Sequence, residues 1–165
     1  MSYPDDPKTL QVLNRIIEVL AAISPADGFF YPVGEGNVIR GVKGWDEITS
    51  FPFDMVYLGS EHRDPEYDMG GMVNKFPTFY VEGFVDAQGE DDTITRLVKH
   101  LADVQKAIDV DIQPGAGEDS LGALASGGNV QVGVAETDDG MLAGEGKAAF
   151  KLTIRACVRG AWGEL

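Results

Sequence analysis

Cysteine and histidine are scarce in this chain, and their scarcity removes several kinds of chemistry. The 165 residues include one cysteine, Cys157, and two histidines, His62 and His100. One cysteine excludes a disulfide framework within the chain and a zinc site built from several cysteines. We expect Cys157 on the polar register of a strand, and no surrounding motif supports a catalytic Cys–His pair.

Basic residues are also few in comparison with acidic ones. Lys and Arg number 13 against 27 Asp and Glu, which gives a formal net charge of -14. A surface this negative repels phosphate groups, which argues against specific nucleic-acid binding. The charge is compatible with a channel through which DNA passes without sticking, with a basic partner protein, or with solubility alone.

Long apolar runs and catalytic motifs are missing as well. The sequence contains no run of about twenty apolar residues and so predicts no membrane span. Its N-terminus, MSYPDDPKTL, is acidic and unlike a signal peptide, so we expect a soluble protein made inside a cell. No Gly-x-Ser-x-Gly, His-Glu-x-x-His or dinucleotide-binding pattern is present, and Gly34-Glu35-Gly36 lacks the lysine of a phosphate loop. The sequence therefore predicts no enzyme, cofactor or metal.

Two segments have the apolar spacing of amphipathic helices. The first covers residues 7–23, with Asp6 as the expected N-cap and Pro7 as the first helical residue. The second covers about 91–110, with Asp91 and Asp92 at its start, where carboxylates favour the helix dipole. The apolar stripes consist of Leu10, Leu13, Ile17 and Leu20 in the first helix, and Ile94, Leu97, Leu101, Val104 and Ile108 in the second, with Val98 beside them.

Several segments between the helices are typical of strands. Residues 29–33 and 37–40 predict a small hairpin around Gly34-Glu35-Gly36, with Pro32 indicating an edge. A strand is expected over 53–58, and the run FPTFYVEGFVD predicts a central strand covered on both faces. Residues 61–75 mix charges, a proline and two glycines, so we expect an exposed loop there. Residues 113–128 read as a glycine-rich linker.

The C-terminal quarter predicts a long antiparallel hairpin. Apolar and polar residues alternate over 150–159 and, before them, over 130–135. Asp138, Asp139 and Gly140 lie between the two runs, and Asp-Gly is a common turn pair because glycine accepts a positive φ. The spacing of a calcium loop is absent, so we interpret these aspartates as a turn and not as metal ligands.

Together the elements predict a single domain over 1–165 of the α+β class. We expect a mostly antiparallel β-sheet with two amphipathic helices packed on one face, plus the long C-terminal hairpin. The predicted core consists of Leu13, Ile17, Leu20, Phe79, Val81, Leu97, Leu101, Val104, Leu152 and Ile154.

One cluster is dense in titratable side chains, and it lies in the expected loop: Glu61, His62, Arg63 and Asp64. A solvated or interface loop is the interpretation that we prefer over an acid–base site. Interface contacts are also expected at the hairpin tip, with Asp138, Asp139 and Met141. The two tryptophans, Trp45 and Trp162, are further interface candidates, and a partly buried structural role is an equal alternative for each.

The order and spacing of these segments resemble the tail terminator, or tail completion, proteins of long-tailed bacteriophages. The segments that carry the resemblance are LQVLNRIIEVLAAI, FFYPV…NVIRG, FPTFYVEGFVD, ITRLVKHLADVQKAIDVDI, VAETDDG and AAFKLTIRACVRG. The resemblance implies a homo-oligomeric ring, usually a hexamer, at the head-proximal end of the tail of the virion. Such a ring caps the tail tube protein, stops its polymerisation and meets the head completion or neck protein, while the genome DNA passes through the lumen.

Other functions stay open at this point. Related head–tail joining (neck) proteins share much of the pattern. An acidic inhibitor, such as an immunity or DNA-mimic protein, would have the same charge and would bind one basic partner. A hydrolase using Glu61 to Asp64 is a third possibility. The length of the 61–75 segment also departs from the compact members of the family.

Overall fold

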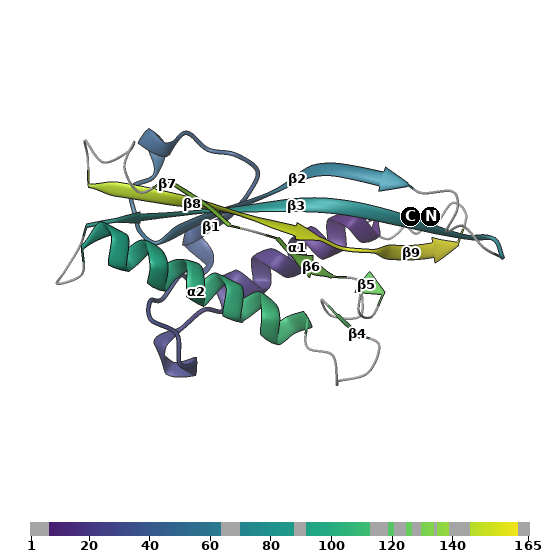
Figure 1. Cartoon of the computed structure of the whole chain (residues 1–165), viewed down its shortest axis with the longest axis horizontal. Coiled ribbons are helices and arrows are strands. Elements are labelled where there is room, and N and C mark those ends of the chain that lie inside the picture. The colour runs from purple at the N-terminus through teal and green to yellow at the C-terminus, as the bar shows by residue number, and fades with distance from the viewer. Residues whose placement is uncertain are drawn as a thin grey trace, which may run out of the picture.

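A computed structural model of the chain shows one extended sheet with two helices packed on one of its faces (Figure 1). It describes residues 7–63, 70–87, 92–112, 119–120, 125–126, 130–133, 135–138 and 146–161. The helices are α1 (Lys8–Ala21) and α2 (Thr93–Ile112), with 3-10 turns η1 (Pro25–Asp27), η2 (Glu35–Asn37) and η3 (Trp45–Glu47). The main strands are β1 (Val38–Arg40), β2 (Phe53–Arg63), β3 (Met72–Asp86), β8 (Lys147–Arg155) and β9 (Val158–Ala161). Shorter strands are β4 (Asp119–Ser120), β5 (Ala125–Ser126), β6 (Gln131–Val132) and β7 (Glu136–Asp138).

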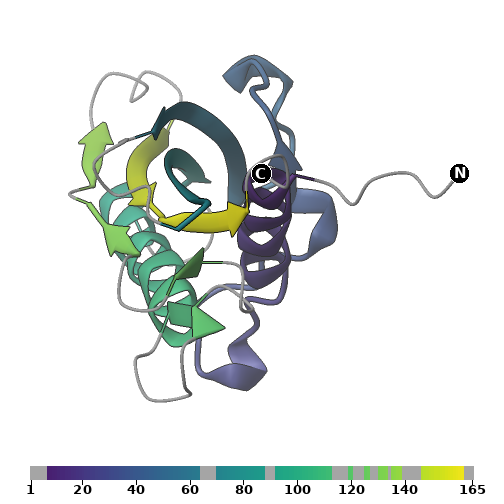
Figure 2. The same cartoon turned by 90° about the vertical axis from the view of Figure 1, so that its right-hand side faces the viewer.

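The sheet follows the order β1-β2-β3-β8-β6, with β7 also paired to β8 and β9 paired to β3. All these pairs are antiparallel except β1–β2. The helix α1 packs beneath β1 and β2, and α2 packs beneath β3 and β8. Figure 2 shows the two helices side by side under the curled sheet. The predicted α+β class, mostly antiparallel sheet and one-sided helical layer are confirmed.

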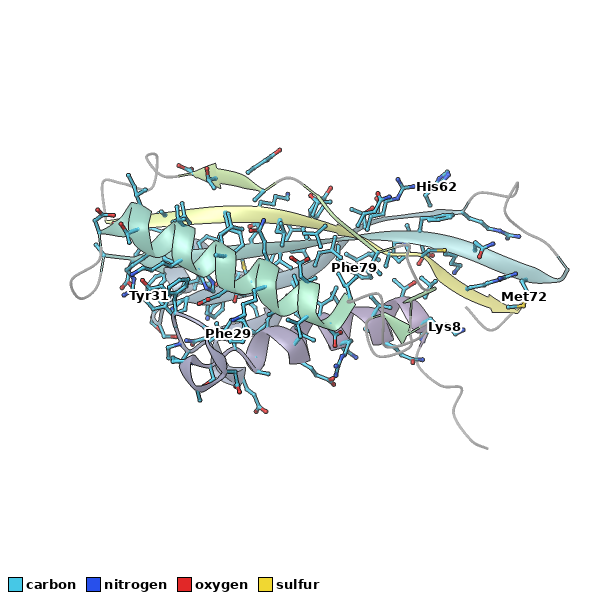
Figure 3. All side chains as sticks on the ribbon, turned by 60° about the horizontal axis from the view of Figure 1, so that its bottom comes forward. Lys8, Phe29, Tyr31, His62, Met72 and Phe79 are labelled. Atoms are coloured by element: carbon cyan, nitrogen blue, oxygen red, sulfur yellow. The ribbon has the colours of Figure 1, made fainter. Side chains whose placement is uncertain are left out.

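The core lies between the helices and the sheet, where Phe79 is enclosed (Figure 3). Eight of the ten predicted core residues are buried, whereas Ile17 and Leu101 are only partly buried. β3 was predicted to be covered on both faces, and the structure covers fully only the face toward the helices. On the face opposite the helices, Tyr80 and Glu82 are half-buried, and a second, small cluster covers only Phe84, which packs near Ile48.

Both helices form where the apolar spacing predicts them, with shifts in detail. Pro7, with ψ of 141°, is the N-cap of α1 and not its first helical residue, and Asp6 lies outside the described residues. In α2 the buried side is rotated from the predicted stripe. Ile94 and Val98 are 55% and 61% exposed, while Arg96, His100 and Asp103 are buried.

The predicted hairpin over residues 29–40 is wrong. Residues 29–33 form no strand, and the glycine run leads through η2 into β1, which pairs in parallel with β2 at Val38–Asp54. The edge position expected for Pro32 is therefore wrong too. Parallel pairing joins β1 to a strand that begins after an intervening connection, and nothing in the local pattern signals it.

The expected loop over 61–75 is shortened by two strands that continue into it, and its residues 64–69 lie outside the described part. Residues Glu61–Arg63 end β2, residues Met72–Lys75 begin β3, and the two strands pair through Arg63 and Lys75. A register shift between Leu58 and Ser60 precedes this part of the hairpin. Sequence alternation failed here because the sheet runs on past the central core, so apolar periodicity is weak on both faces.

The strand pairing of the C-terminal hairpin is confirmed, with one irregularity. Asp138, expected in the turn, instead lies in β7, and the expected tip over 139–145 lies outside the described residues. Gln131 pairs with Arg155 but Glu136 pairs with Lys151, so one extra residue lies on the β6–β7 side between them. Cys157 is buried in the break between β8 and β9, which corrects its expected polar position. The predicted linker contains a short β4–β5 pair, and its other residues lie outside the described part.

Candidate assembly surfaces

The sheet face opposite the helices carries a row of cations on aromatic rings. Along β8, Lys147, Lys151 and Arg155 recur every four residues, so they share one face of the strand. Their charged groups lie over rings: the Lys147 Nζ is 5.1 Å from the centroid of Trp45, the Lys151 Nζ 4.1 Å from Tyr80, and the Arg155 Cζ 5.5 Å from Phe76. Cation–π contact holds these side chains flat on the sheet.

A hydrogen-bonded tyrosine lies in the middle of this face. The Tyr57 hydroxyl donates to the Glu82 Oε1 at 2.5 Å, and its ring contacts that of Tyr80 at 5.5 Å between centroids. Burial, followed by the hydrogen bond to Glu82, raises the pKa of Tyr57 above its ordinary value. The Tyr57 hydroxyl in turn raises the pKa of Lys151. At neutral pH this face therefore presents a neutral phenol between a carboxylate and an ammonium group.

Three members of the predicted cluster, Glu61, His62 and Arg63, are described, and they do not share one face of their strand. Glu61 and Arg63 lie on one face of β2, and His62 lies on the other, opposite Phe76. Figure 3 shows His62 on the side of the sheet away from the helices. The Glu61 carboxylate accepts from the Thr9 hydroxyl at 2.6 Å and lies 3.2 Å from the Lys75 ammonium. It ties the hairpin to the start of α1, where Lys8 also donates to a β9 carbonyl. His62 and Arg63 are exposed.

Two other predicted contact residues are described. Trp45 lies in η3, is 39% exposed and is held by Lys147. Asp138 lies in β7 opposite Ala149 and lines an open depression of about 260 Å³ together with Glu82, Glu136 and Lys151. Asp64, Asp139, Met141 and Trp162 fall outside the described residues. Within the described ranges, no group of three or more His, Cys, Asp and Glu side chains is placed to hold a metal ion.

A clamp between α2 and the segment 28–31 was not predicted. The buried Asp103 carboxylate accepts from the backbone N–H of Phe30 at 2.9 Å and from that of Tyr31 at 3.0 Å. The Lys106 ammonium donates to the Gly28 carbonyl at 2.8 Å, and Gly28 has a φ of 82°, a conformation that favours glycine. The segment is thereby fixed with Phe30 57% exposed.

Cations of the same helix cover the aromatic rings of this segment. Arg96 lies 4.8 Å from the Tyr31 ring, and Lys106 lies 4.5 Å from the Phe29 ring, which is next to α2 in Figure 3. A row of charged residues at helical spacing on α2 was the only sequence signal for the clamp. Such a row reads equally well as a solvated helix face, and for that reason it was missed.

A second buried polar contact joins α2 to the sheet. The His100 Nε2 lies 2.9 Å from the Asp54 Oδ1, and both residues are fully buried. The neighbouring Gly83 leaves room for this pair, because a Cβ there would lie 2.8 Å from the Asp54 Oδ1 and 2.2 Å from the Phe150 ring. The contact fixes the rotation of α2 against β2.

An open groove lies between the ends of the two helices. Its volume is about 290 Å³, and its walls include Val19, Ala22, Phe29 and Val110. Arg15 spans the groove to Asp111, with its Nη2 at 2.7 Å from the carboxylate, and this hydrogen bond raises the pKa of Arg15. Among the described helices, none is long and apolar enough to cross a membrane.

Comparison with known proteins agrees with this architecture. A family model described as Bacteriophage Tail Tube Terminator Protein matches residues 9–159. Among solved structures, the chain is similar to the sheath/tube terminator of an extracellular contractile injection system, PVC, in the extended state. That likeness has a TM-score of 0.50 at 11% identity and covers 94% of this chain and 58% of the other chain.

No curated protein matches the chain. The family match begins one residue into α1 and ends within β9, and it confirms the resemblance seen in the sequence. The chain belongs to the bacteriophage tail tube terminator family.

Proposed function

We propose that this protein forms a ring that caps the tail tube, ends its polymerisation and joins the tail to the head or neck. The observation that carries the proposal is the family match over residues 9–159. Membership gives the chain a structural role at the end of a tail tube. The ring, its six subunits and its head-proximal position in the virion extend that role and follow from the family resemblance.

The shape of the domain supports such a ring. A tube polymer grows because each added ring presents the same surface again, so a cap must match that surface on one side and differ on the other. The layered domain has unlike sides: a helical layer with a clamped aromatic segment, and a sheet face with cations on aromatic rings. The two unlike surfaces suit two unlike partners, the tail tube protein and the head completion or neck protein.

The charge supports a lumen for the genome. With a net charge of -14, the protein as a whole repels phosphate groups. DNA passing through a ring of such subunits meets no strong binding site. We therefore propose passage of DNA without specific binding, with no cofactor and no enzymatic step.

Electron microscopy of lysates tests the proposal. A phage that lacks this gene is expected to give heads without attached tails and tubes of uncontrolled length. Tails of normal length that stay unattached would instead indicate a neck protein. Normal tails joined to heads would refute the terminator role and favour an inhibitor, which native mass spectrometry would show as a monomer or dimer bound to one basic partner.

A further inference from the structure

We propose that a second copy of this chain docks on the outer side of the helical layer, with Phe30 of each copy in the groove of the other. The first half of this contact, the aromatic knob, consists of Phe30 and Lys99. The second half is the open groove between the ends of the two helices, whose walls include Val19, Ala22 and Val110. Such a dimer is a state of the free protein and is independent of the proposed ring.

The aromatic knob is exposed although the segment that carries it is held in place. Phe30 is 57% exposed, while its neighbours Phe29 and Tyr31 lie half-buried against α2 (Figure 3). The buried Asp103 carboxylate accepts from the Phe30 backbone N–H, and the Lys99 ammonium lies 5.6 Å from the centroid of the Phe30 ring. An exposed aromatic side chain on a fixed backbone loses little conformational freedom on binding, which is typical of interface anchors.

The groove has the size and the lining that such a ring requires. Its volume is about 290 Å³, whereas an apolar cavity of about 150 Å³ is enough to hold a benzene ring. Its apolar walls include Val19, Ala22 and Val110, and Val110 is 58% exposed. In a single copy these apolar groups face solvent, so an aromatic ring that enters from outside gains by burial there.

The charges of the two halves are complementary. The Phe30 ring carries the Lys99 ammonium, and the Asp103 carboxylate beside it is buried and engaged by backbone N–H groups. Three carboxylates and one cation line the groove, so the cation neutralises only part of its charge: Glu18, Asp27, Asp111 and Arg15. Glu18 and Asp27 are exposed. An ammonium group that enters the groove with the ring therefore meets carboxylates, and this fixes the orientation of the partners.

Knob and groove lie on one stripe of α2, which makes the contact reciprocal. Lys99 and Val110 are eleven residues apart, so they lie within about 20° of each other around the helix and about 16 Å apart along it. Both are more than about 100° from the buried Val104, on the side away from the sheet. Lys106 lies between them and donates to a backbone carbonyl of its own copy. Two copies that lay this side of α2 antiparallel across a two-fold axis bring each Phe30 to the groove of the other.

A two-fold contact of this kind uses the same surfaces on both copies and closes after two of them. It therefore differs from the head-to-tail contacts that a ring requires. Because the described part of the chain carries both the knob and the groove that fits it, the occupant that these observations favour is a second copy of this chain.

Native mass spectrometry of the purified full chain tests the contact. The wild type is expected to form dimers whose share rises with protein concentration. Phe30→Ala removes the knob and Val110→Glu places a charge in the groove, so each is expected to raise the dimer dissociation constant by about tenfold or more. Ile94→Glu is the matched control, because Ile94 is 55% exposed and lies about 160° from Val110 around the same helix. It is expected to match the wild type, and circular dichroism checks that all three variants are folded.

A mixture of the two variants tests the pairing of knob and groove directly. Phe30→Ala keeps an intact groove and Val110→Glu keeps an intact knob, so a heterodimer regains one complete contact that neither homodimer has. An equimolar mixture is expected to contain heterodimer in excess of random pairing, and the different masses of the two variants identify it.

Three results would overturn the dimer contact. One is a wild type that stays monomeric at every concentration tested. Another is a wild-type dimer that Phe30→Ala and Val110→Glu leave unchanged. The third is a mixture in which heterodimers form only at the random level. None of these results bears on the terminator role, which the lysate experiment tests separately.

Discussion

The clamp at Asp103 allows a sharp prediction for the variant Asp103→Ala. The carboxylate is 2% exposed and accepts backbone hydrogen bonds from Phe30 and Tyr31 at 2.9–3.0 Å. Its removal leaves two backbone N–H groups without their acceptor. Each such group costs about 1–3 kcal/mol when buried. Because the segment is only half-buried, water replaces part of the loss, and we expect the free energy of unfolding to fall by about 2–4 kcal/mol.

Urea unfolding measures the global effect, and limited chymotrypsin digestion measures the local one. Chymotrypsin cleaves after aromatic residues, so release of the segment is expected to expose cleavage at Phe29, Phe30 and Tyr31. Asp109→Ala is the matched control: it lies on the same helix and is exposed, and a change within about 0.5 kcal/mol is expected. The reasoning is refuted if Asp103→Ala matches this control in both assays.

Three further outcomes follow from the core and the sheet face. Gly83→Ala is expected to destabilise by about 1–3 kcal/mol in urea, because its Cβ would lie 2.2 Å from the Phe150 ring; an unchanged midpoint would contradict this packing. His100→Ala is expected to lower the free energy of unfolding by at least about 2 kcal/mol, because a cavity forms and Asp54 loses its partner. Asp54→Asn keeps an acceptor for His100 and is expected to lower it by less. Equal losses of stability in the two variants would argue against the contact. Tyr57 is expected to ionise above its ordinary pKa of 10.0, seen as the absorbance difference between wild type and Tyr57→Phe. The raised pKa means that the fold favours the neutral phenol, so the contribution of Tyr57 to stability is complete below about pH 10 and is lost above it. Ionisation of Tyr57 with a pKa at or below 10.0 would contradict its burial.

Much of the fold was predictable because its central elements bury one face each. Alternation in β8 placed Phe150, Leu152 and Ile154 in the core, and the spacing in α1 placed Leu13 and Leu20 there. These patterns are local and are read directly from the order of residues. They were enough to predict a one-sided α+β layer, and the order of the segments was enough to indicate the family.

What was missed depends on contacts distant in sequence. The rotation of α2 is fixed by Asp54, Phe30 and Tyr31, which lie 46 to 73 residues away from their partners His100 and Asp103. The parallel β1–β2 pair has no local signal either. The predicted contact residues stay predictions: the structure places Glu61, His62, Arg63, Trp45 and Asp138 on the molecule, and no partner is present to test them.

The polar contacts of α2 also decide which apolar side chains of the helix stay at the surface. Val98 lies about 100° around the helix from the buried Leu97, so only a rotation of a quarter turn or more would bring it under the sheet. That rotation would pull His100 from Asp54 and Asp103 from Phe30, leaving buried polar groups unpaired. These contacts therefore keep Ile94 and Val98 outside the core of the subunit. Substitutions that replaced His100 and Asp103 with apolar residues would leave the rotation of α2 to apolar packing alone, and hydrogen bonds would no longer fix the surface that the helix presents.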